Sequence, residues 1–227
     1  DHLGQIGRHQ EHGGAAVLTR VTFHRNTSTG RAAGFYTYKS YPKLTDVVFL
    51  DNAAPDHAAF YNYKGTCTLA GCLLLRNRCT KSGSPTIYNY RGTATLVNTI
   101  IAGNRGHGLY TSRGTVNLTS CNVTANSGTG LSLGSSATTV MVNCIVYANQ
   151  GGQLSRPATA TYSCIQGGHA GTGNISGNPQ LMNPHTGNAR IPLTSPCYNA
   201  GDGKAPNLAA KDFEGEPRVI AGRVDIG

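Results

Sequence analysis

The chain has 227 residues and a formal net charge of +9, yet only 13% of its residues are charged, against about 25% in a typical soluble domain. It holds 30 Gly, 25 Thr and 18 Asn and few strong helix formers, which excludes a largely helical protein. No run of about 18 residues is predominantly apolar, so we expect no transmembrane segment. The length suits one domain, residues 1–227, with a sizeable core.

The distribution of charged residues along the chain limits the possible functions further. The excess of Lys and Arg favours an anionic partner. No Asp or Glu occurs between Asp56 and Asp202, whereas nine Lys and Arg do. Glycoside hydrolysis usually needs a pair of facing carboxylates, and calcium needs a cluster of oxygen ligands. The middle of the chain supplies neither, so we expect no metal site and no cofactor.

Residues 1–16 lack a periodic pattern and are predicted to be an irregular N-terminal segment. They contain His2, His9 and His12, and His24 follows shortly after. The spacing of these His residues fits no metal-site template, so we treat the cluster as incidental. No amphipathic segment that could cap the first coil precedes residue 17.

Residues 17–168 contain a repeat, a ten-residue block that ends in Asn. The six copies are 17–26, 43–52, 68–77, 95–104, 117–126 and 140–149, and a degraded seventh runs through 160–168. Successive Asn residues lie 22 to 27 positions apart. A period of this length is typical of a solenoid, in which each repeat forms one coil.

Apolar residues recur at fixed offsets in these blocks. One column holds Leu18, Leu44, Leu69, Leu96, Leu118 and Met141, and another holds Phe23, Phe49, Leu74, Ile101, Val123 and Val146. Alternation between columns is the period of a strand with one inward face. A single short strand cannot bury that face, but stacked coils can. The sequence therefore predicts an all-β, right-handed parallel β-helix (β-solenoid) of about seven or eight coils.

The Asn that ends each block is predicted to be structural. Asn tolerates left-handed backbone at a turn, and its amide can hydrogen-bond along a stack of identical turns. We therefore expect this column to close each strand rather than to bind a ligand.

Seven Cys residues are present. We place Cys72, Cys121, Cys144 and Cys164 in one inward column of buried thiols that lie side by side without bonding. The disulfide state of the other three stays open, with Cys67–Cys79 as the local pair to test; the three are Cys67, Cys79 and Cys197. No Cys-x-x-Cys pair supports a structural zinc site.

A second segment recurs in each coil, at 34–39, 59–64, 86–91, 108–113 and 130–135. If its apolar residue points inward, alternation sends the neighbouring Tyr outward. The first predicted Tyr column is Tyr36, Tyr61, Tyr88 and Tyr110, and the second is Tyr38, Tyr63 and Tyr90. A basic column follows them directly, formed by Lys39, Lys64, Arg91 and Arg113.

This Tyr and basic face has more than one interpretation. Stacked aromatic residues stabilise parallel strands, which alone could explain the columns. A structural ladder, however, needs no cation in every coil, whereas phenol faces flanked by cations suit sugar rings that carry carboxylate or sulfate. The same strip suits a protein partner or another copy of the chain. We expect no nucleic acid partner, because no familiar nucleic-acid module is present.

Residues 169–227 are predicted to form a C-terminal closing segment. The repeat resembles that of the pectate-lyase-like superfamily, and the run from Ser195 resembles the end of choice-of-anchor Q domain proteins. Its matching positions are Ser195, Pro196, Ala200, Gly201, Asp202, Asp212, Gly215, Arg218, Asp225, Ile226 and Gly227. The resemblance implies that a polar network ties down the final coil, formed by Asp202, Asp212, Glu214, Glu216, Arg218 and Asp225.

The superfamily resemblance also raises polysaccharide lyase as an activity. β-Elimination from a uronate needs a group that neutralises the carboxylate, a base and an acid. A metal-independent lyase on acidic glycans could use Arg105, His107 and Tyr110, with Lys81 among further candidates nearby. The polygalacturonase-like hydrolases of the superfamily depend on several Asp in the central coils, and the absence of acids there excludes that activity.

The sequence therefore favours a non-catalytic β-solenoid, structural or adhesive, at the cell surface or outside the cell. Its Tyr and basic face is predicted to contact an acidic polysaccharide or another subunit. Since the first coil has no cap, its strand edges could also stack end to end into a filament. The alternative is the metal-independent lyase.

Overall fold

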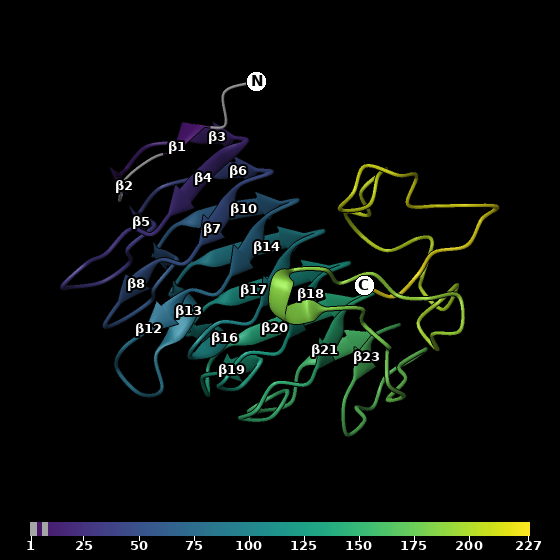
Figure 1. Ribbon diagram of the computed structural model, residues 1–227. Helices are drawn as coiled ribbons and strands as arrows, with labels where there is room; N and C mark the ends of the chain where they lie inside the picture. The colour runs from purple at the N-terminus through teal and green to yellow at the C-terminus, as the bar shows by residue number, and fades with distance from the viewer. Residues whose placement is uncertain (1–3, 6–8) are drawn as a thin grey trace.

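The computed structural model describes residues 4–5 and 9–227 and winds them into a parallel β-solenoid (Figure 1). Three long sheets of eight, seven and six strands run along its sides, and each named strand pairs in parallel with its counterparts in neighbouring coils. The predicted all-β fold is confirmed. The prediction of seven or eight coils is slightly too high, because the end coils lack strands on one or two sheets and about six turns are complete.

The strands have the following bounds. The eight-stranded sheet contains β1 (Gly4–Gln5), β4 (Val21–His24), β7 (Val48–Leu50), β11 (Leu73–Leu75), β15 (Ile100–Ala102), β18 (Asn122–Thr124), β21 (Ile145–Tyr147) and β23 (Cys164–Ile165). The seven-stranded sheet contains β3 (Val17–Thr19), β6 (Lys43–Thr45), β10 (Thr66–Ala70), β14 (Thr93–Val97), β17 (Thr115–Thr119), β20 (Thr138–Val142) and β22 (Thr159–Thr161). The six-stranded sheet contains β2 (His9–His12), β5 (Phe35–Tyr38), β9 (Phe60–Tyr63), β13 (Pro85–Tyr90), β16 (His107–Ser112) and β19 (Leu131–Leu133). A two-stranded sheet pairs β8 (Ala53–Ala54) with β12 (Arg78–Cys79), and one short 3₁₀ helix, η1, spans Pro184–Thr186.

The sheets meet at corners where a single residue takes left-handed backbone. Between the seven- and eight-stranded sheets these residues are Arg20, Asp46, Gly71, Asn98, Ser120, Asn143 and Tyr162. After the eight-stranded sheet they are Arg25, Asp51, Arg76, Gly103, Ala125 and Ala148. After the six-stranded sheet they are Gly13, Lys39, Lys64, Arg91 and Arg113. The repeat Asn is therefore not the left-handed residue that we expected, because that conformation falls on the residue before it.

The repeat Asn side chains instead turn inward and form a continuous ladder. The Nδ2 of Asn52 donates to the Oδ1 of Asn77 at 2.9 Å, and the same bond recurs in each following coil as far as Asn149. The second Nδ2 hydrogen donates to a backbone carbonyl, such as that of Leu74 from Asn104 at 2.9 Å. The predicted amide stacking is confirmed, and at Asn149 the ladder ends on Gln153.

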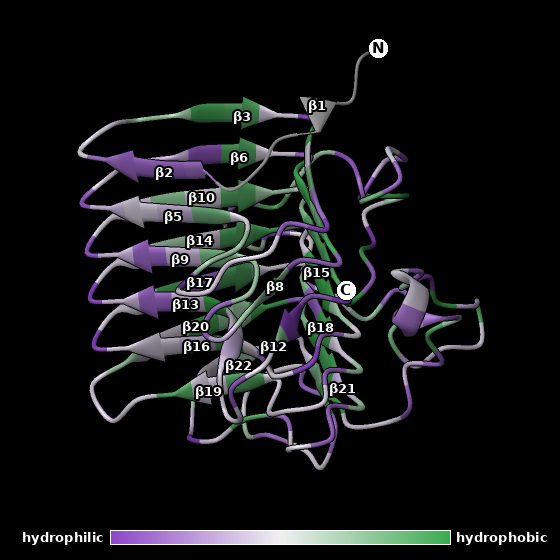
Figure 2. Ribbon diagram, turned by 60° about the vertical axis from the view of Figure 1, so that its left-hand side comes forward, coloured by the Kyte–Doolittle hydropathy of each residue, from purple (hydrophilic) through white to green (hydrophobic). Residues whose placement is uncertain are grey.

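The core lies between the three sheets and follows the predicted columns. Leu69 pairs with Leu44 and Leu96, while Leu74 pairs with Phe49 and Ile101. These side chains are fully buried. In the side view of Figure 2, β15 of the eight-stranded sheet is hydrophobic, whereas the arrowheads of β9 and β13 are hydrophilic. The six-stranded sheet is thus the polar side of the solenoid.

The cysteines are all free and buried. Cys72, Cys121 and Cys144 lie in the main core as predicted. Cys164 does not join their column, because it pairs in register with Ile145 and Ser163 takes the position beside Cys144. A slip of one residue along a strand reverses the side on which the side chain lies. Cys164 consequently packs in a separate cluster with Cys197, while Cys67 and Cys79 form no disulfide.

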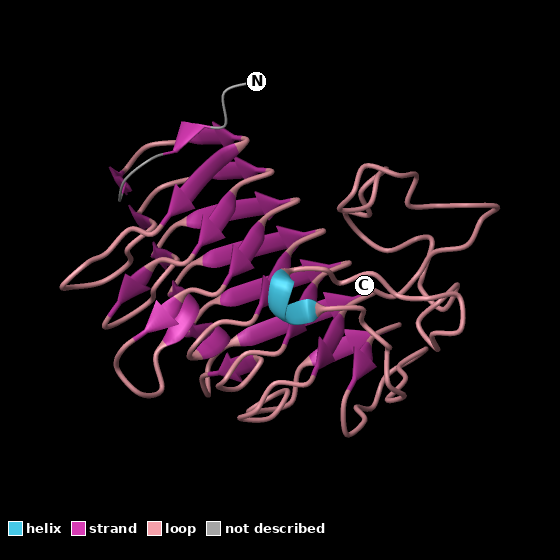
Figure 3. Cartoon of the chain, in the orientation of Figure 1, coloured by secondary structure: helices cyan, strands magenta, loops and turns pink. Residues whose placement is uncertain are grey.

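The ends of the chain also differ from expectation. The segment predicted to be irregular contains β1 and β2, which add the first strands to two sheets. Residues 169–227 pack along the side of the solenoid as a long arm with little regular structure (Figures 1 and 3). The hydroxyl of Thr119 donates to the Pro206 carbonyl at 2.8 Å, and Asn143 Nδ2 donates to that of Asp202 at 3.0 Å.

The arm therefore contacts three successive coils, at Asn98, Thr119 and Asn143. It covers outward-facing apolar side chains of the eight-stranded sheet, where Ala189 packs against a cluster that contains Ile100. The polar C-terminal residues were expected to tie down the final coil, and the structure shows the arm bound to earlier coils as well, through Arg218 at Asn98. An open sheet with apolar residues on both faces needs such a cover, because otherwise the outer face meets water.

The ladder predicts the effect of removing one amide. In Asn104→Ala, Asn77 loses its acceptor, and Leu74 and Asn126 lose their donor. We expect the free energy of unfolding to fall by about 3–5 kcal/mol, because each buried polar group left unpaired costs about 1–3 kcal/mol. The control Asn117→Ala, on the outer face of β17, should change it by less than about 0.5 kcal/mol. Urea denaturation measures both, and equal losses would contradict the ladder's role.

Candidate functional site

The outer face of the six-stranded sheet carries the two predicted Tyr columns. Tyr61 lies in register with Tyr36 and Tyr88, and Tyr88 with Tyr110. Ring centroids along this first column are 5.0 to 5.2 Å apart. In the second column the Tyr38–Tyr63 and Tyr63–Tyr90 separations are 5.2 and 5.1 Å. The alternation predicted from the sequence therefore places the Tyr residues as continuous stacks.

A buried polar column fixes these Tyr residues from behind. Between the two Tyr positions of each strand lies an inward residue, and these are Thr37, Asn62, Asn89 and Thr111, all fully buried. Asn62 Nδ2 donates to Asn89 Oδ1 at 2.8 Å and to the Gly65 carbonyl at 3.0 Å. The hydroxyl of Thr37 donates to Asn62 Oδ1 at 3.0 Å. Because this second ladder holds the strands in register, the Tyr residues on either side of it face outward.

The basic column runs along the edge of the second Tyr column. Lys39, Lys64 and Arg91 each follow a Tyr, and the charged group lies 5.3 Å from the ring centroid of that Tyr in each case. This distance is within the range of a cation–π contact. Arg113 takes the same left-handed corner but follows Ser112. The predicted basic column is therefore present, with its ring contacts limited to the first three coils.

The structure corrects one part of the predicted face. Tyr61 is on the outer side of the sheet, but only 2% of its surface is exposed. The His57 ring lies 4.7 Å from it, and the Arg31 guanidinium lies 5.9 Å above it. Burial raises the pKa of Tyr61, so its hydroxyl stays protonated. Tyr36, Tyr88 and Tyr110 remain half-buried on the surface of the same column.

Beside Tyr61 lies a hollow of about 440 Å³, which we call the Arg31 hollow. Its floor is Tyr61, Tyr63, Tyr88 and Tyr90, and its wall is Arg31, Asp56, His57 and Lys81. The Ser84 hydroxyl donates to Asp56 Oδ1 at 2.7 Å and holds the pKa of that carboxyl below its usual value. Lys81 Nζ lies 3.7 Å from the same oxygen. Burial lowers the pKa of His57 to about 4, so the ring is neutral at pH 7.

Sequence reasoning missed Arg31, Asp56 and His57, although the repeat lengths contain the signal. We compare the number of residues between each ladder Asn and the next inward residue of the six-stranded sheet. In the first three coils this segment runs from residue 26 to 35, from 52 to 60 and from 77 to 87. In the next two coils the same segment is shorter and runs from residue 104 to 109 and from 126 to 131. The extra residues form the loops that carry the wall of the Arg31 hollow. Insertions in a repeat protein commonly lie together on one face, which is often the binding face.

The residues proposed for a lyase are only partly brought together. His107 and Tyr110 line a second hollow of about 490 Å³, together with Arg156, whereas Arg105 does not line it. His107 Nδ1 accepts a hydrogen bond from the Thr129 backbone N–H at 2.8 Å, and burial lowers the pKa of this ring. One ring nitrogen of His107 is thus occupied in holding the next coil, and the predicted set Arg105, His107 and Tyr110 does not share one site.

The described N-terminal His residues, His9, His12 and His24, lie in separate contacts. His2 lies outside the described residues. His12 instead extends the aromatic face, with its ring 5.5 Å from Tyr38, and His9 packs 5.0 Å from Phe35. His24 Nε2 lies 3.6 Å from the Asp51 carboxylate, a contact separate from that face. Among residues 4–5 and 9–227, no group of three or more His, Cys, Asp or Glu is arranged to hold a metal ion.

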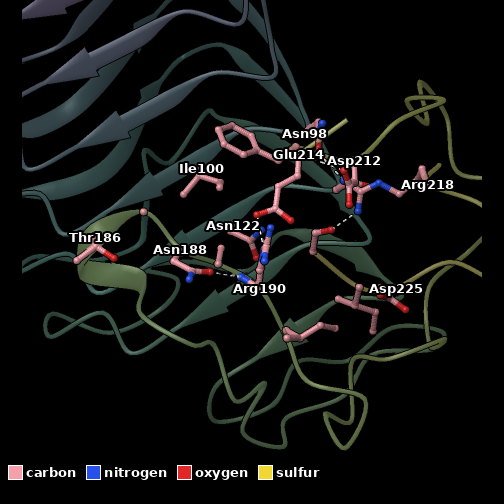
Figure 4. A pocket seen from close by; sticks show the side chains of 17 residues that line it. Asn98, Ile100, Asn122, Thr186, Asn188, Arg190, Asp212, Glu214, Arg218 and Asp225 are labelled. Atoms are coloured by element: carbon pink, nitrogen blue, oxygen red, sulfur yellow. Dashed lines mark hydrogen bonds and ion pairs between the residues drawn. The ribbon is translucent and has the colours of Figure 1, made fainter. Parts of the chain in front are cut away.

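A larger cleft of about 700 Å³ lies between the C-terminal arm and the eight-stranded sheet (Figure 4). Arg218 donates there to Asn98 Oδ1 and to the Gly227 carbonyl, while Arg190 pairs with Glu214. Burial lowers the pKa of Arg218. Because Arg218 of the arm bonds to Asn98 of the solenoid, we interpret this region as the junction that holds the arm in place.

The fold and this outer face define a parallel β-solenoid repeat protein with an aromatic and basic surface on one sheet. The family model described as "Right handed beta helix region" matches residues 20–178. This match covers more than half of the chain, and the protein belongs to that family. A search of curated proteins finds no match. None of the described segments forms a helix with the length and apolar character needed to cross a membrane.

The junction at Arg218 predicts how the arm can be released. Asn98→Gly keeps the left-handed corner but removes the acceptor of the buried Arg218 guanidinium and the bond to the Lys211 carbonyl. Loss of a hydrogen bond to a buried charge costs about 1.5–3 kcal/mol, so cleavage within residues 182–227 should accelerate at least about tenfold. Ser120→Gly, at the same corner one coil on, is the control. Limited proteolysis with mass spectrometry measures both, and equal rates would refute the role of Asn98.

His57 predicts an acid-dependent loss of stability. In the unfolded chain His protonates near pH 6.5, whereas in the fold its pKa is about 4. Between these values the unfolded state binds more protons, so stability falls as pH decreases, by about 3 kcal/mol in total. His57→Asn should reduce the slope of unfolding free energy against pH by about 1.4 kcal/mol per unit in this window. The exposed His185→Asn is the control, and an unchanged slope in His57→Asn would contradict the assignment.

Proposed function

We propose that this protein is a non-catalytic adhesive or structural solenoid of the cell surface or the extracellular space, whose Tyr and basic face binds acidic glycans. The supporting observation is the left-handed corner that borders this face. Gly13 takes this corner after β2, and in the four following coils, which carry the Tyr columns, every residue there is basic, namely Lys39, Lys64, Arg91 and Arg113. The other two corner columns mix basic, acidic, polar and apolar residues. The same backbone geometry therefore carries a uniform charge only beside the Tyr columns.

The physical chemistry of the face matches a charged sugar polymer. Half-exposed phenol rings offer flat apolar surfaces on which sugar rings stack. The coils repeat at about 4.8 Å, a distance of the same order as the advance per residue of a linear glycan. Lys and Arg at each coil then meet carboxylate or sulfate groups through charge-assisted hydrogen bonds. The resemblance to pectate-lyase-like and choice-of-anchor Q proteins stays a prediction that agrees with this proposal.

The lyase remains the less favoured function, because Arg105 does not line the hollow that His107 and Tyr110 share. Self-association is the other alternative for the same face. Ring stacking within the columns serves a scaffold equally well, and β3 at the first coil exposes Val17. Binding to a glycan, turnover of a glycan and assembly give different results in the experiment below.

The proposal predicts retarded migration through native gels cast with acidic polysaccharide. Because Tyr61 is buried, the informative variant is Tyr63→Ala/Tyr90→Ala, which removes two half-exposed rings of the second column. Loss of stacking at about 1 kcal/mol per ring should weaken binding about tenfold or more. The matched control is Tyr41→Ala/Tyr198→Ala, which removes two exposed rings outside the columns.

Retardation of the native chain and the control, but not of the ladder variant, is the expected result. A cleared zone in the stained gel would instead identify the lyase. Equal mobility of all three proteins in every gel would refute glycan binding, and self-association that rises with concentration and is lost in Tyr63→Ala/Tyr90→Ala would then assign the face to assembly.

A further inference from the structure

The Arg31 hollow is built from the loops of three successive coils. A parallel β-bridge aligns Arg31 with Asp56. The Lys81 backbone N–H donates to the Pro55 carbonyl of the coil before it at 3.2 Å. These bonds hold the Arg31, Asp56 and Lys81 positions beside one another over the Tyr floor. The wall is therefore positioned by the solenoid itself rather than by free loops.

The charged side chains that line the hollow do not cancel one another. Arg31 and Lys81 are cationic, and Asp56 is held ionised by the Ser84 hydroxyl and by Lys81. His57 is neutral at pH 7, and the four Tyr of the floor are neutral as well. The lining of the hollow thus carries a charge of +1, which a single anionic group would balance.

A buried polar atom in the wall also lacks a partner. His57 is 8% exposed, and its Nδ1 has no hydrogen-bond partner in the described structure. Its ring packs 4.7 Å from Tyr61 and 4.5 Å from Tyr88. A buried nitrogen without a partner costs free energy, so the ring is held beside the hollow by its packing against Tyr61 and Tyr88.

We infer that the Arg31 hollow binds one monoanionic sugar, whose carboxylate or sulfate ester lies between Arg31 and Lys81 while its ring rests on Tyr63, Tyr88 and Tyr90. This inference rests on the proposed function and gives it a specific subsite. The hollow selects for one charge per sugar, because a dianion would overcompensate the lining and meet Asp56. The remainder of the glycan follows the Tyr columns toward the coils of Tyr110 and Tyr36.

The test compares two variants of equal net charge. Arg31→Gln/Lys81→Gln removes the two cations of the hollow, and Lys43→Gln/Lys204→Gln removes two exposed cations elsewhere. Isothermal titration calorimetry measures binding of trigalacturonate, its methyl ester and a sulfated neutral trisaccharide of the same length. We expect the hollow variant to raise the Kd of the preferred anion at least tenfold, and the control to change it less than twofold. The methyl ester should bind at least tenfold more weakly than the anion does.

Nuclear magnetic resonance of the His57 imidazole provides a second readout on the native chain. Its signals should shift when the preferred anionic trisaccharide is added and should not shift with the methyl ester. A stronger response to the carboxylate or to the sulfated sugar identifies the anion. Thermal melting of both variants establishes that they fold, as the exposed positions of the replaced side chains predict.

The outcomes separate this inference from the proposed function. If the hollow variant binds as tightly as its control while Tyr63→Ala/Tyr90→Ala has lost binding, the glycan lies elsewhere on the face. The proposed function then stands and the subsite is refuted. If the native chain binds no acidic glycan and His57 does not respond, both are overturned.

Discussion

The buried Asn ladder is the interaction on which the rest of the solenoid depends. Each repeat Asn bonds to the next one and to a backbone carbonyl, so the buried polar groups after the eight-stranded sheet are paired although they are shut off from water. An unpaired amide in this position would cost more than a hydrogen bond returns. The ladder also fixes register, because an amide displaced by one residue would face solvent. The coils therefore stack with their columns aligned as far as Asn149.

Because the coils are aligned, residues that recur at one position of each repeat form continuous rows along the surface of the solenoid. The second ladder, through Asn62 and Asn89, sets the register of the six-stranded sheet in the same way. Since side chains alternate along a strand, any residue that flanks this ladder lies directly over its counterpart in the next coil. The Tyr stacks are thus a consequence of buried polar bonds beneath them. A single inward Asn between two Tyr residues places both rings outside.

Structural features that repeat in each coil could be predicted from the sequence, whereas features that occur only once could not. Column membership, strand positions and the Tyr face follow from periodicity, as the pairing of Leu69 with Leu96 shows. Cys164 was misplaced because the last copy is degraded, and one residue decides its side. The burial of Tyr61 depends on Arg31 and His57, which lie in loops without a pattern. The arm packs through single contacts such as Arg218 with Asn98, which no periodicity encodes.

The repeat lengths explain why the candidate site occupies the first three coils rather than the whole face. From the inward residue of the six-stranded sheet to the next ladder Asn, the distance is the same in four coils, 35 to 52, 60 to 77, 87 to 104 and 109 to 126. That part is constrained by the core and by the Asn bonds. In these four coils, length varies only in the loop before the six-stranded sheet, which lies outside the core. The next interval, 131 to 149, is one residue longer. A loop outside the core can lengthen at little thermodynamic cost, so it is where this solenoid could acquire charged side chains such as Arg31 and Lys81 without disturbing the stack.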